Sequence, residues 1–306
     1  MGVWIDTDMG FDDIAAILMM ARSQLVIDGV SLVFGNAPLA QVRANAASAA
    51  ATFGWGFPIH AGREMPVLAP LETAERILGE TGIPSAGRRF APAAALPDSN
   101  AFQALCRWLE DDGPRRILAL GPLTNIAALA LARPDLAARI TELTWMGGGL
   151  TAGNHTASAE FNAYADPEAL AIVLSHGLPL RMVDLDICRK VLVSPGDPER
   201  LRGLGGANAG LVADLFAGYV NIAVSRGRAS MALYDPTAAA IFIAPEVAGF
   251  RHARIDAELQ GQHTRGRTVV ETRAAHGEFN AHYAADIDAD AVRRLFLEAL
   301  AAEARR

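Results

Sequence analysis

The sequence Val-Trp-Ile-Asp-Thr-Asp-Met-Gly-Phe-Asp-Asp, residues 3–13, joins a short apolar run to a cluster of four acidic side chains. The run 3–5 predicts a buried parallel strand, and the apolar positions of residues 11–22 fall on one face of a predicted helix. In an open α/β sheet, ligands bind at the carboxyl ends of the strands, where such a strand gives way to a helix. This stretch therefore predicts both the beginning of the fold and the position of a site.

The same alternation of strand and helix continues through most of the chain. We expect further strands at residues 25–34, 116–120, 142–146 and 180–183, and helices at residues 41–53, 102–111, 123–132, 167–175, 208–224 and 236–243. Alternation of this kind predicts the α/β class, with an open, mostly parallel, Rossmann-like sheet that carries helices on both faces. Strands at residues 254–259, 268–272 and 281–284 and a helix at 289–302 predict a smaller C-terminal strand and helix extension.

The chain shows neither a linker-like change in composition nor an internal repeat. We therefore expect residues 1–306 to form one domain, which is within the size range of single α/β domains. Residues 67–98 are rich in Pro, Gly and Ala and lack a long periodic element, which predicts an irregular excursion. Because loops of this kind often carry function, we expect this segment to fold over a site.

The composition excludes several classes of function. Charged residues make up 20% of the 306 residues and the net charge is −7, without a basic run long enough to bind a nucleic-acid backbone. No apolar run reaches the ~18 residues that would span a bilayer. The two cysteines, Cys106 and Cys188, lack a CxxC spacing, which argues against a disulfide framework and a thiolate metal site. We expect a cytoplasmic protein that binds neither nucleic acid nor membrane.

The four clustered carboxylates, Asp6, Asp8, Asp12 and Asp13, need a source of positive charge. A helix N-terminus stabilises an anion by only ~0.3–1 kcal/mol, which is too little for four carboxylates. Carboxylates this close together must take up protons, spread into water or share a cation. Because oxygen ligands suit hard cations, the cluster favours a divalent metal site. It is not an EF-hand loop, because the twelfth position counted from Asp6 is Ile17 rather than glutamate.

A series of short motifs supplies a family resemblance. The pattern Asp6-x-Asp8-x-Gly10-x-Asp12-Asp13 is followed, in order, by Gly35-Asn36, Gly121-Pro122-Leu123-Thr124-Asn125, Met146-Gly147-Gly148-Gly149, Gly153-Asn154, Ala159-Glu160-Phe161-Asn162 and Asp235-Pro236. With these motifs the chain resembles the inosine–uridine-preferring nucleoside hydrolase family. Chance would rarely place all of them in this order, and they extend across most of the chain.

The resemblance implies Ca²⁺-dependent hydrolysis of the N-glycosidic bond of a ribonucleoside to ribose and a free base. It assigns the calcium ligands to the side chains of Asp8, Asp13 and Asp235 and to the backbone carbonyl of Thr124, and it makes Asp8 the general base. The residues that it places around the substrate are Asp12, Asn36, Met146, Asn154, Glu160, Phe161 and Asn162. It also implies a small-molecule ribonucleoside as the partner and a homodimer or homotetramer as the assembly.

Two positions depart from the family pattern. Many members have histidine before the late aspartate, as the acid that protonates the departing base, where this chain has Tyr234. Many also have a His-Gly pair in the earlier flexible region, where the local match is Leu78-Gly79. We assign Tyr234 a catalytic position, either as a weak acid, with an ordinary pKa of ~10, or as a partner that stacks on the base. The residues near the pocket whose roles stay open are His155, Tyr219, Arg226 and Arg228.

Two other functions stay open. A strand that ends in Asp-x-Asp also resembles the haloacid-dehalogenase phosphatases, in which the first aspartate, here Asp6, is the nucleophile. The chain offers that mechanism only one lysine, Lys190, and no convincing later acidic metal motif. The third interpretation is a non-catalytic, metal-dependent binder of nucleosides or ribose, which the presence of Asp8 disfavours because a binder needs no base. Purine and pyrimidine nucleosides are both open as substrates.

Overall fold

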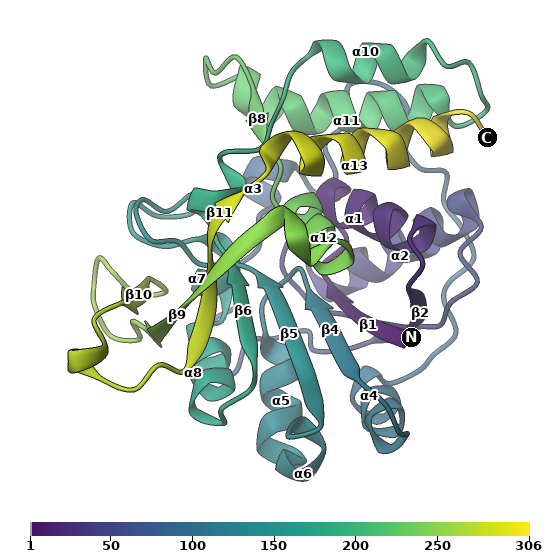
Figure 1. The fold of residues 1–306 in the computed structure, drawn as a ribbon. Helices are drawn as coiled ribbons and strands as arrows, with labels where there is room; N and C mark the ends of the chain where they lie inside the picture. The colour runs from purple at the N-terminus through teal and green to yellow at the C-terminus, as the bar shows by residue number, and fades with distance from the viewer. Residues whose placement is uncertain (1) are drawn as a thin grey trace.

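The computed structural model describes residues 2–306 and contains a nine-stranded sheet (Figure 1). Its strands are β1 (Gly2–Thr7), β2 (Val26–Leu32), β3 (Ile59–Ala61), β4 (Arg115–Ala119), β5 (Ile140–Met146), β6 (Leu180–Val183), β9 (Ala248–Ala257), β10 (Thr268–Glu271) and β11 (Ala281–Ile287). They lie in the order β10-β9-β11-β6-β5-β4-β1-β2-β3. All neighbouring pairs from β11 to β3 are parallel, whereas β9 is antiparallel to both β10 and β11.

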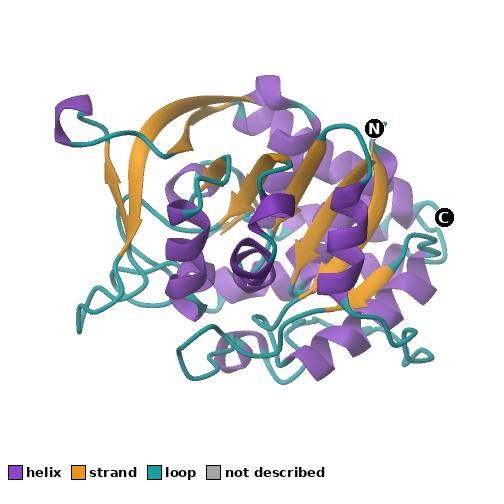
Figure 2. Ribbon diagram, turned by 90° about the horizontal axis from the view of Figure 1, so that it is seen from below, coloured by secondary structure: helices purple, strands orange, loops and turns teal. Residues whose placement is uncertain are grey.

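Helices cover both faces of the sheet, as predicted (Figure 2). Alternate residues of β1 point to opposite faces: Val3 and Ile5 pack into one apolar cluster, and Trp4 packs into another. The helices of the first cluster are α1 (Phe11–Arg22), α2 (Leu39–Phe53), α11 (Ala209–Val224), α12 (Asp235–Ile243) and α13 (Ala289–Ala304). Those of the second are α4 (Ala101–Glu110), α5 (Thr124–Ala132) and α8 (Pro167–Ser175). The mostly parallel, Rossmann-like α/β fold is therefore confirmed.

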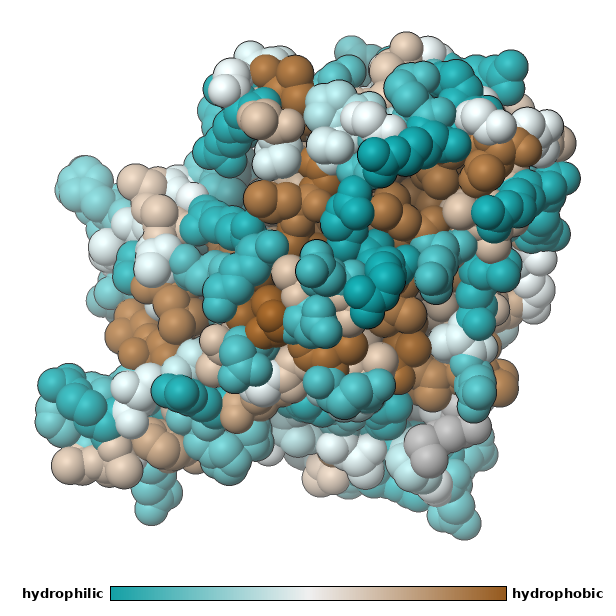
Figure 3. All heavy atoms as spheres, turned by 45° about the horizontal axis from the view of Figure 1, so that its top comes forward, coloured by the Kyte–Doolittle hydropathy of each residue, from teal (hydrophilic) through white to brown (hydrophobic). Residues whose placement is uncertain are grey.

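The C-terminal extension continues the main sheet rather than forming a separate layer. Strand β11 pairs in parallel with β6, and β9 and β10 extend the sheet beyond it (Figure 1). The strand predicted at 254–259 begins earlier, at Ala248, because residues 248–253 pair with β11. On the side of the molecule formed by α10 (Gly196–Arg202), α11 and α13, apolar patches are broken up by hydrophilic side chains (Figure 3).

Several short elements escaped prediction, because segments of two to seven residues show too little periodicity. Besides β3 and α10 they are β7 (Leu192–Val193), β8 (Met231–Ala232), α3 (Glu75–Leu78), α6 (Pro134–Ala137), α7 (Phe161–Ala165), α9 (Leu185–Cys188) and the 3₁₀ turns η1 (Pro245–Val247) and η2 (Ala274–His276). Strands β7 and β8 form a separate two-stranded sheet. No helix within residues 2–306 combines the length and the apolar character needed to cross a bilayer.

The carboxyl ends of the central strands bring three predicted site residues, and one that was not predicted, Leu120, together. Asp8 follows β1, Asn36 lies beyond β2, Leu120 follows β4, and Met146 ends β5. All four line the same cavity. Because these strands are parallel, their carboxyl ends meet at one edge of the sheet, which is where ligands bind in open α/β folds.

The backbone is packed tightly around Asp8. Met9, the next residue, is fully buried and has a φ of 52°, a left-handed conformation that costs a residue with a side chain roughly 1–2 kcal/mol. Gly35 approaches from β2, and a Cβ atom at this position would lie 1.9 Å from Oδ2 of Asp8. Strained and crowded backbone of this kind is typical of functional sites, where the surrounding fold holds it in place.

Candidate active site

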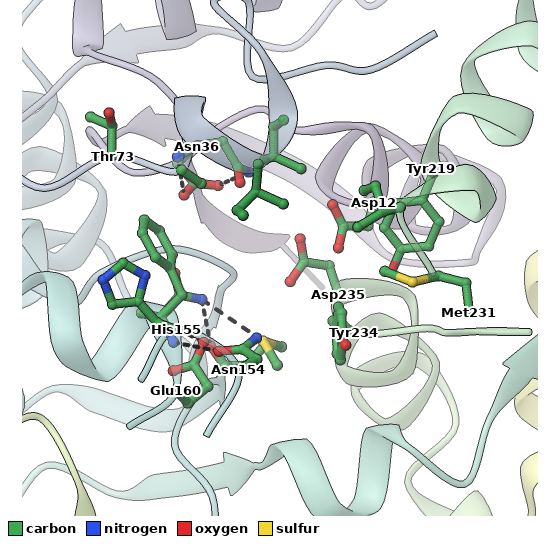
Figure 4. A pocket seen from close by; sticks show the side chains of 18 of the residues that line it. Asp12, Asn36, Thr73, Asn154, His155, Glu160, Tyr219, Met231, Tyr234 and Asp235 are labelled. Atoms are coloured by element: carbon green, nitrogen blue, oxygen red, sulfur yellow. Dashed lines mark hydrogen bonds between the residues drawn. The ribbon is translucent and has the colours of Figure 1, made fainter. Parts of the chain in front are cut away.

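A cavity opens at this edge of the sheet and gathers side chains from distant parts of the chain (Figure 4). Residues 72–74 and 76–78 line it, the latter from α3, so the excursion 67–98 does fold over a site. Other lining residues come from the loop before α7, from α11, from β8 and from the start of α12. The predicted site residues that line the cavity are Asp8, Asp12, Asn36, Met146, Asn154, Glu160, Phe161, Asn162, Tyr234 and Asp235.

Three carboxylates converge at one side of the cavity. One oxygen of each of Asp12, Asp13 and Asp235 lies within 4.8 Å of the other two. Asp12 and Asp13 belong to the first turn of α1, whereas Asp235 begins α12, so the packing of these two helices brings the acids together. The carboxylates of Asp12 and Asp235 lie next to each other and point toward one another (Figure 4). Asp13 is fully buried and lies outside the cavity lining.

Burial is the largest cause that raises the pKa of each of these carboxyl groups. It raises the pKa of Asp12 to about 7, with the charge of Asp13 adding to the effect. The pKa values of Asp8 and Asp235 are raised well above the ordinary range, by burial first and then by the charge of Asp13. Within residues 2–306, no lysine, arginine or histidine forms an ion pair with any of these four carboxylates. Buried anions in this arrangement need either protons or a cation.

Neutral donors hold the carboxylates of Asp8 and Asp13 in place. Asn36 donates to Asp8 from its backbone N–H at 2.8 Å and from its side-chain amide at 2.7 Å. The same amide also donates to Oδ2 of Asp13 at 3.1 Å. Asp13 accepts further hydrogen bonds from the Thr7 hydroxyl at 2.5 Å and from the Gly10 N–H at 2.9 Å. Asp8 is therefore oriented toward the cavity by uncharged groups only.

Two asparagine side chains present complementary groups to the cavity. The Oδ1 atom of Asn154 accepts a hydrogen bond from the Phe161 N–H at 2.9 Å, which leaves its amide N–H groups as donors. The Nδ2 atom of Asn162 donates to the backbone carbonyls of Leu120 at 2.9 Å and Met146 at 3.0 Å, which leaves its carbonyl oxygen as an acceptor. A donor and an acceptor at neighbouring places suit the hydroxyl groups of a sugar.

Glu160 is held at the start of α7. Its carboxylate accepts hydrogen bonds from the backbone N–H groups of Gly148 at 2.9 Å, Asn162 at 2.8 Å and Ala163 at 2.9 Å. Burial raises the pKa of Glu160 to about 7, and these backbone donors oppose the rise. Three donors fix the carboxylate firmly, so Glu160 can accept from a hydroxyl group in one defined direction.

Aromatic and apolar side chains form the other end of the cavity. Tyr219, Met231 and Tyr234 lie together, across the cavity from Glu160 (Figure 4). The Tyr219 hydroxyl donates to the backbone carbonyl of Ala232 at 2.7 Å, so its proton is already engaged. A flat heteroaromatic ring would fit between such side chains, whereas a sugar suits the polar end.

Tyr234 is a poor proton donor in this setting. Burial is the largest cause that raises its pKa to about 12, with the charge of Cys188 adding and those of Arg189 and Arg228 opposing. An acid with this pKa gives up its proton less readily near neutrality than a free tyrosine does.

The His155 side chain lies at the polar end of the cavity and does not point into solvent. Its Nε2 atom lies 3.3 Å from Oε1 of Glu72, and its ring packs against Tyr164 and Phe161 with centroid separations of 4.5 Å and 5.4 Å. Burial is the largest cause that lowers the pKa of His155, so the neutral imidazole is favoured. The contact ties the loop before α7 to the excursion that covers the cavity.

A family model described as "Inosine-uridine preferring nucleoside hydrolase" matches residues 3–294. The chain belongs to this family. The non-specific ribonucleoside hydrolase RihC of Salmonella newport is 33% identical over 301 residues, which cover 97% of this chain and 96% of the relative. The pyrimidine-specific ribonucleoside hydrolase RihA of Salmonella agona is 31% identical over 303 residues, with 97% and 96% covered. This nucleoside hydrolase is thus an N-ribosyl hydrolase that acts on ribonucleosides.

Solved structures agree with the fold. A purine-preferring ribonucleoside hydrolase from Gardnerella vaginalis superposes with a TM-score of 0.91 at 23% identity, over 100% of this chain and 99% of the other. An inosine-guanosine nucleoside hydrolase superposes with a TM-score of 0.86 at 26% identity, over 99% and 98%. The predicted family and enzyme class are therefore confirmed, and the interpretations of the chain as a phosphatase or as a non-catalytic binder are wrong.

Asp6 has a structural position in this nucleoside hydrolase. It is fully buried and lies outside the cavity lining. Its Oδ1 atom accepts hydrogen bonds from the side-chain amide of Asn125 at 2.7 Å and from the hydroxyl of Ser31. A nucleophile has to reach its substrate, so this placement also argues against the phosphatase mechanism.

Thr124, whose backbone carbonyl is a predicted metal ligand, is the first residue of α5. It is buried, and its hydroxyl donates to Oδ2 of Asp166 at 2.6 Å. Thr124 lies outside the cavity lining, whereas Leu120, four residues earlier, is part of it. The assignment of its backbone carbonyl to the metal stays a prediction.

Sequence reasoning missed the apolar part of the lining. These residues are Leu120, Ile77, Ile222, Ala223 and Met231. No motif marks them, because any apolar side chain of suitable size would serve. The available signal was their position. Ile77 lies in the excursion over the site, Leu120 ends the predicted strand 116–120, and Ile222, Ala223 and Met231 lie at the end of the predicted helix 208–224 or between it and the late aspartate.

Proposed function

We propose that this nucleoside hydrolase depends on Ca²⁺ and uses Asp8 as its general base. The observation that carries the proposal is the convergence of buried carboxylates that form no ion pair with a basic side chain within residues 2–306. Asp12, Asp13 and Asp235 present oxygens within 4.8 Å of one another, and the pKa of Asp8 is raised in part by the charge of Asp13. All the available ligand atoms are oxygens, which suits Ca²⁺ and other hard divalent cations.

The residues fit such an ion in charge as well as in chemistry. Asp13 and Asp235 of this set would hold it by their side chains together with Asp8, which the family resemblance adds, and the backbone carbonyl of Thr124 is the fourth ligand that the resemblance implies. When bound, the ion supplies positive charge that orients the hydroxyl groups of the sugar and lowers the pKa of water. The three carboxylates come from the turn before α1, from α1 and from α12, so the ion would join segments that are distant in the sequence.

The chain's own residues supply the remaining steps. Asp8, held by Asn36, accepts the proton of the water that attacks the anomeric carbon. The cleavage passes through a ribosyl cation, which the surrounding carboxylates stabilise electrostatically. The residues that bind the ribose in this proposal are Asp12, Asn36, Asn154, Glu160 and Asn162, with Met146 and Phe161 packing against the substrate.

Tyr234 lines the end of the cavity that would receive the base. Its raised pKa, about 12, supports a role in packing against the ring over a role as proton donor. Stacking of this kind contributes ~0.5–1.5 kcal/mol, or about one tenfold step in rate. We therefore propose that Tyr234 is a wall of the base pocket.

A reducing-sugar assay tests the proposal. Protein dialysed against a chelator is incubated with inosine, adenosine, guanosine, uridine and cytidine, before and after Ca²⁺ is restored. We expect ribose release that falls by more than ~100-fold in the chelated protein and returns with Ca²⁺. Ribose release that is unchanged by the chelator would contradict the metal dependence while leaving the family and its reaction in place.

Three further predictions accompany this function. One sheet takes strands from Gly2 to Ile287, which supports a single domain over residues 1–306. The homodimer or homotetramer stays a prediction that light scattering on the purified protein would test. The cytoplasmic location also stays a prediction, for fractionation of the source cells.

A further inference from the structure

Two exposed arginines, Arg226 and Arg228, lie at the end of the cavity that would receive the base. Arg226 and Arg228 both line the cavity and lie in the connection between α11 and β8. Other residues of the same stretch, Ile222, Ala223 and Met231, line the cavity as well. The two arginines therefore belong to the segment that forms the apolar, aromatic end of the cavity, apart from the polar residues that suit the sugar.

The backbone holds these arginines at that place. The N–H groups of Arg226 and Arg228 both donate to the carbonyl of Ala223, at 3.0 Å and 3.1 Å, and the Gly227 N–H donates to that of Val224 at 2.9 Å. Gly227 has a φ of 75°, which lets the chain reverse at the end of α11. The connection is thus an ordered helix end whose two cationic side chains leave from a fixed base.

Neither guanidinium group has an acidic partner in the part of the chain that the structure describes. No ion pair or side-chain hydrogen bond of Arg226 or Arg228 occurs within residues 2–306, although most other arginines of the chain have one. Their positive charge is therefore available to a ligand in the cavity. An arginine side chain has five N–H donors and a permanent positive charge, so it can stabilise an anion but does not act as an acid.

Proton donors are scarce at this end of the cavity. The histidine that lines the cavity, His155, lies at the opposite, polar end beside Asn154 (Figure 4). The Tyr219 hydroxyl is engaged with the carbonyl of Ala232 at 2.7 Å. At this end of the cavity a departing base would thus find two positively charged side chains in place of a proton donor.

We propose that Arg226 and Arg228 are catalytic residues that stabilise the departing base as an anion. This inference rests on the proposed function. In the step, the bond between the anomeric carbon and the base nitrogen breaks, and both electrons leave with the base. Water forms the new bond to the anomeric carbon, and its proton passes to Asp8. The anionic base pairs with the guanidinium groups, takes a proton from solvent after release, and Asp8 returns its own proton to solvent.

The test separates activation of the leaving group from the other steps. The variants are Arg226→Gln, Arg228→Gln and the double variant, with the charge-keeping Arg226→Lys/Arg228→Lys as a second form. Arg294→Gln is the matched control, since Arg294 is exposed on α13 and lies outside the cavity lining. Each protein is assayed with uridine and with p-nitrophenyl β-D-ribofuranoside, whose nitrophenolate leaves without help.

We expect the double glutamine variant to lose about 10- to 100-fold in kcat/KM for uridine, less than the ~10²–10³-fold typical of a buried oxyanion donor because the arginines are partly screened by water. Its rate with the nitrophenyl riboside should change by less than about threefold, and the lysine form should recover most of the loss. The rate ratio of 5-fluorouridine to uridine should also rise in the double variant, because a more acidic base needs less stabilisation. The control should match the wild type.

Three results would overturn the inference. They are an equal loss with both substrates, no loss with uridine, and a loss confined to uridine in Tyr234→Phe but not in the arginine variants. A wild-type protein that cleaves neither substrate would instead contradict the proposed function, and the inference with it. Asp8→Asn should lose turnover with both substrates, because both reactions need the base. That pattern distinguishes loss of the base from loss of the arginines, which should affect uridine alone.

Discussion

The substitution Asp8→Asn removes the proposed base while changing the shape of the side chain very little. Asparagine has nearly the same size as aspartate, but it cannot take a proton from water. In the structure the Asp8 carboxylate faces the cavity and is held there by Asn36, from its backbone N–H at 2.8 Å and its side-chain amide at 2.7 Å. The change therefore tests chemistry more than packing.

The size of the effect follows from these contacts. Loss of a general base lowers kcat by about 10²–10⁴-fold, which corresponds to ~3–5 kcal/mol in the barrier. The new amide has a single oxygen, so one of the two Asn36 donors loses its acceptor at a cost of ~1–3 kcal/mol in the free energy of unfolding. Removal of a negative charge beside Asp13 opposes that cost, because the two carboxylates repel each other. We expect the variant to stay folded and to lose turnover.

Steady-state kinetics with inosine and uridine, at saturating Ca²⁺, check the prediction. The expected pattern is a low kcat with a KM within a few-fold of the wild type, since the groups that hold the sugar are intact. Asp184→Asn is the matched control, because Asp184 is also a buried aspartate but lies outside the cavity lining. If Asp8→Asn kept more than a tenth of wild-type kcat, Asp8 would not be the base.

Two more predictions concern stability and space. The Asp184 carboxyl is buried, its Oδ2 atom has no hydrogen-bond partner within residues 2–306, and burial raises its pKa from 3.8 to about 6. The folded state therefore holds this proton more tightly than the unfolded state, so the free energy of unfolding falls as pH rises from ~4 to ~6. Asp184→Asn should raise the free energy of unfolding above pH 6 by up to ~3 kcal/mol, as measured by urea unfolding. An unchanged urea midpoint at pH 7.5 would contradict this prediction. Gly35→Ala places a Cβ atom 1.9 Å from Oδ2 of Asp8, so kcat should fall by ~100-fold. Gly56→Ala should match the wild type, because a Cβ atom at that position would meet no atom within 4 Å. Equal activity of the two variants would refute the crowding of Asp8 by residue 35.

The helices and strands that could be predicted well are those whose apolar periodicity is visible within the segment itself. Helix α1 is bounded by Phe11 and Arg22, as its apolar periodicity indicates, and the strand before it ends where the acidic residues begin. Strand β3 was missed because its three residues, Ile59–Ala61, carry no period of their own and are held by pairing with β2. The early start of β9, at Ala248, likewise reflects pairing with β11 rather than local sequence.

The site divides in the same way. The clustering of Asp8, Asp12 and Asp13 could be read from spacing alone, together with the need for a cation. The arrival of Asp235 could not, because it depends on the packing of α12 against α1, and only the family resemblance placed it in the site. The apolar end of the cavity was also beyond sequence reasoning, since it is made by the docking of α11 and β8 and not by a motif.

Titration of Ca²⁺ into chelator-stripped protein, followed by isothermal calorimetry, tests the shared metal site most directly. We predict one ion per chain for the wild type and for Asp184→Asn, and binding at least ~100-fold weaker for Asp235→Asn, which lacks one of the three charged ligands. Stoichiometric binding that is unchanged by Asp235→Asn, or no binding to the wild type, would contradict the claim that these carboxylates hold a cation beneath the sugar.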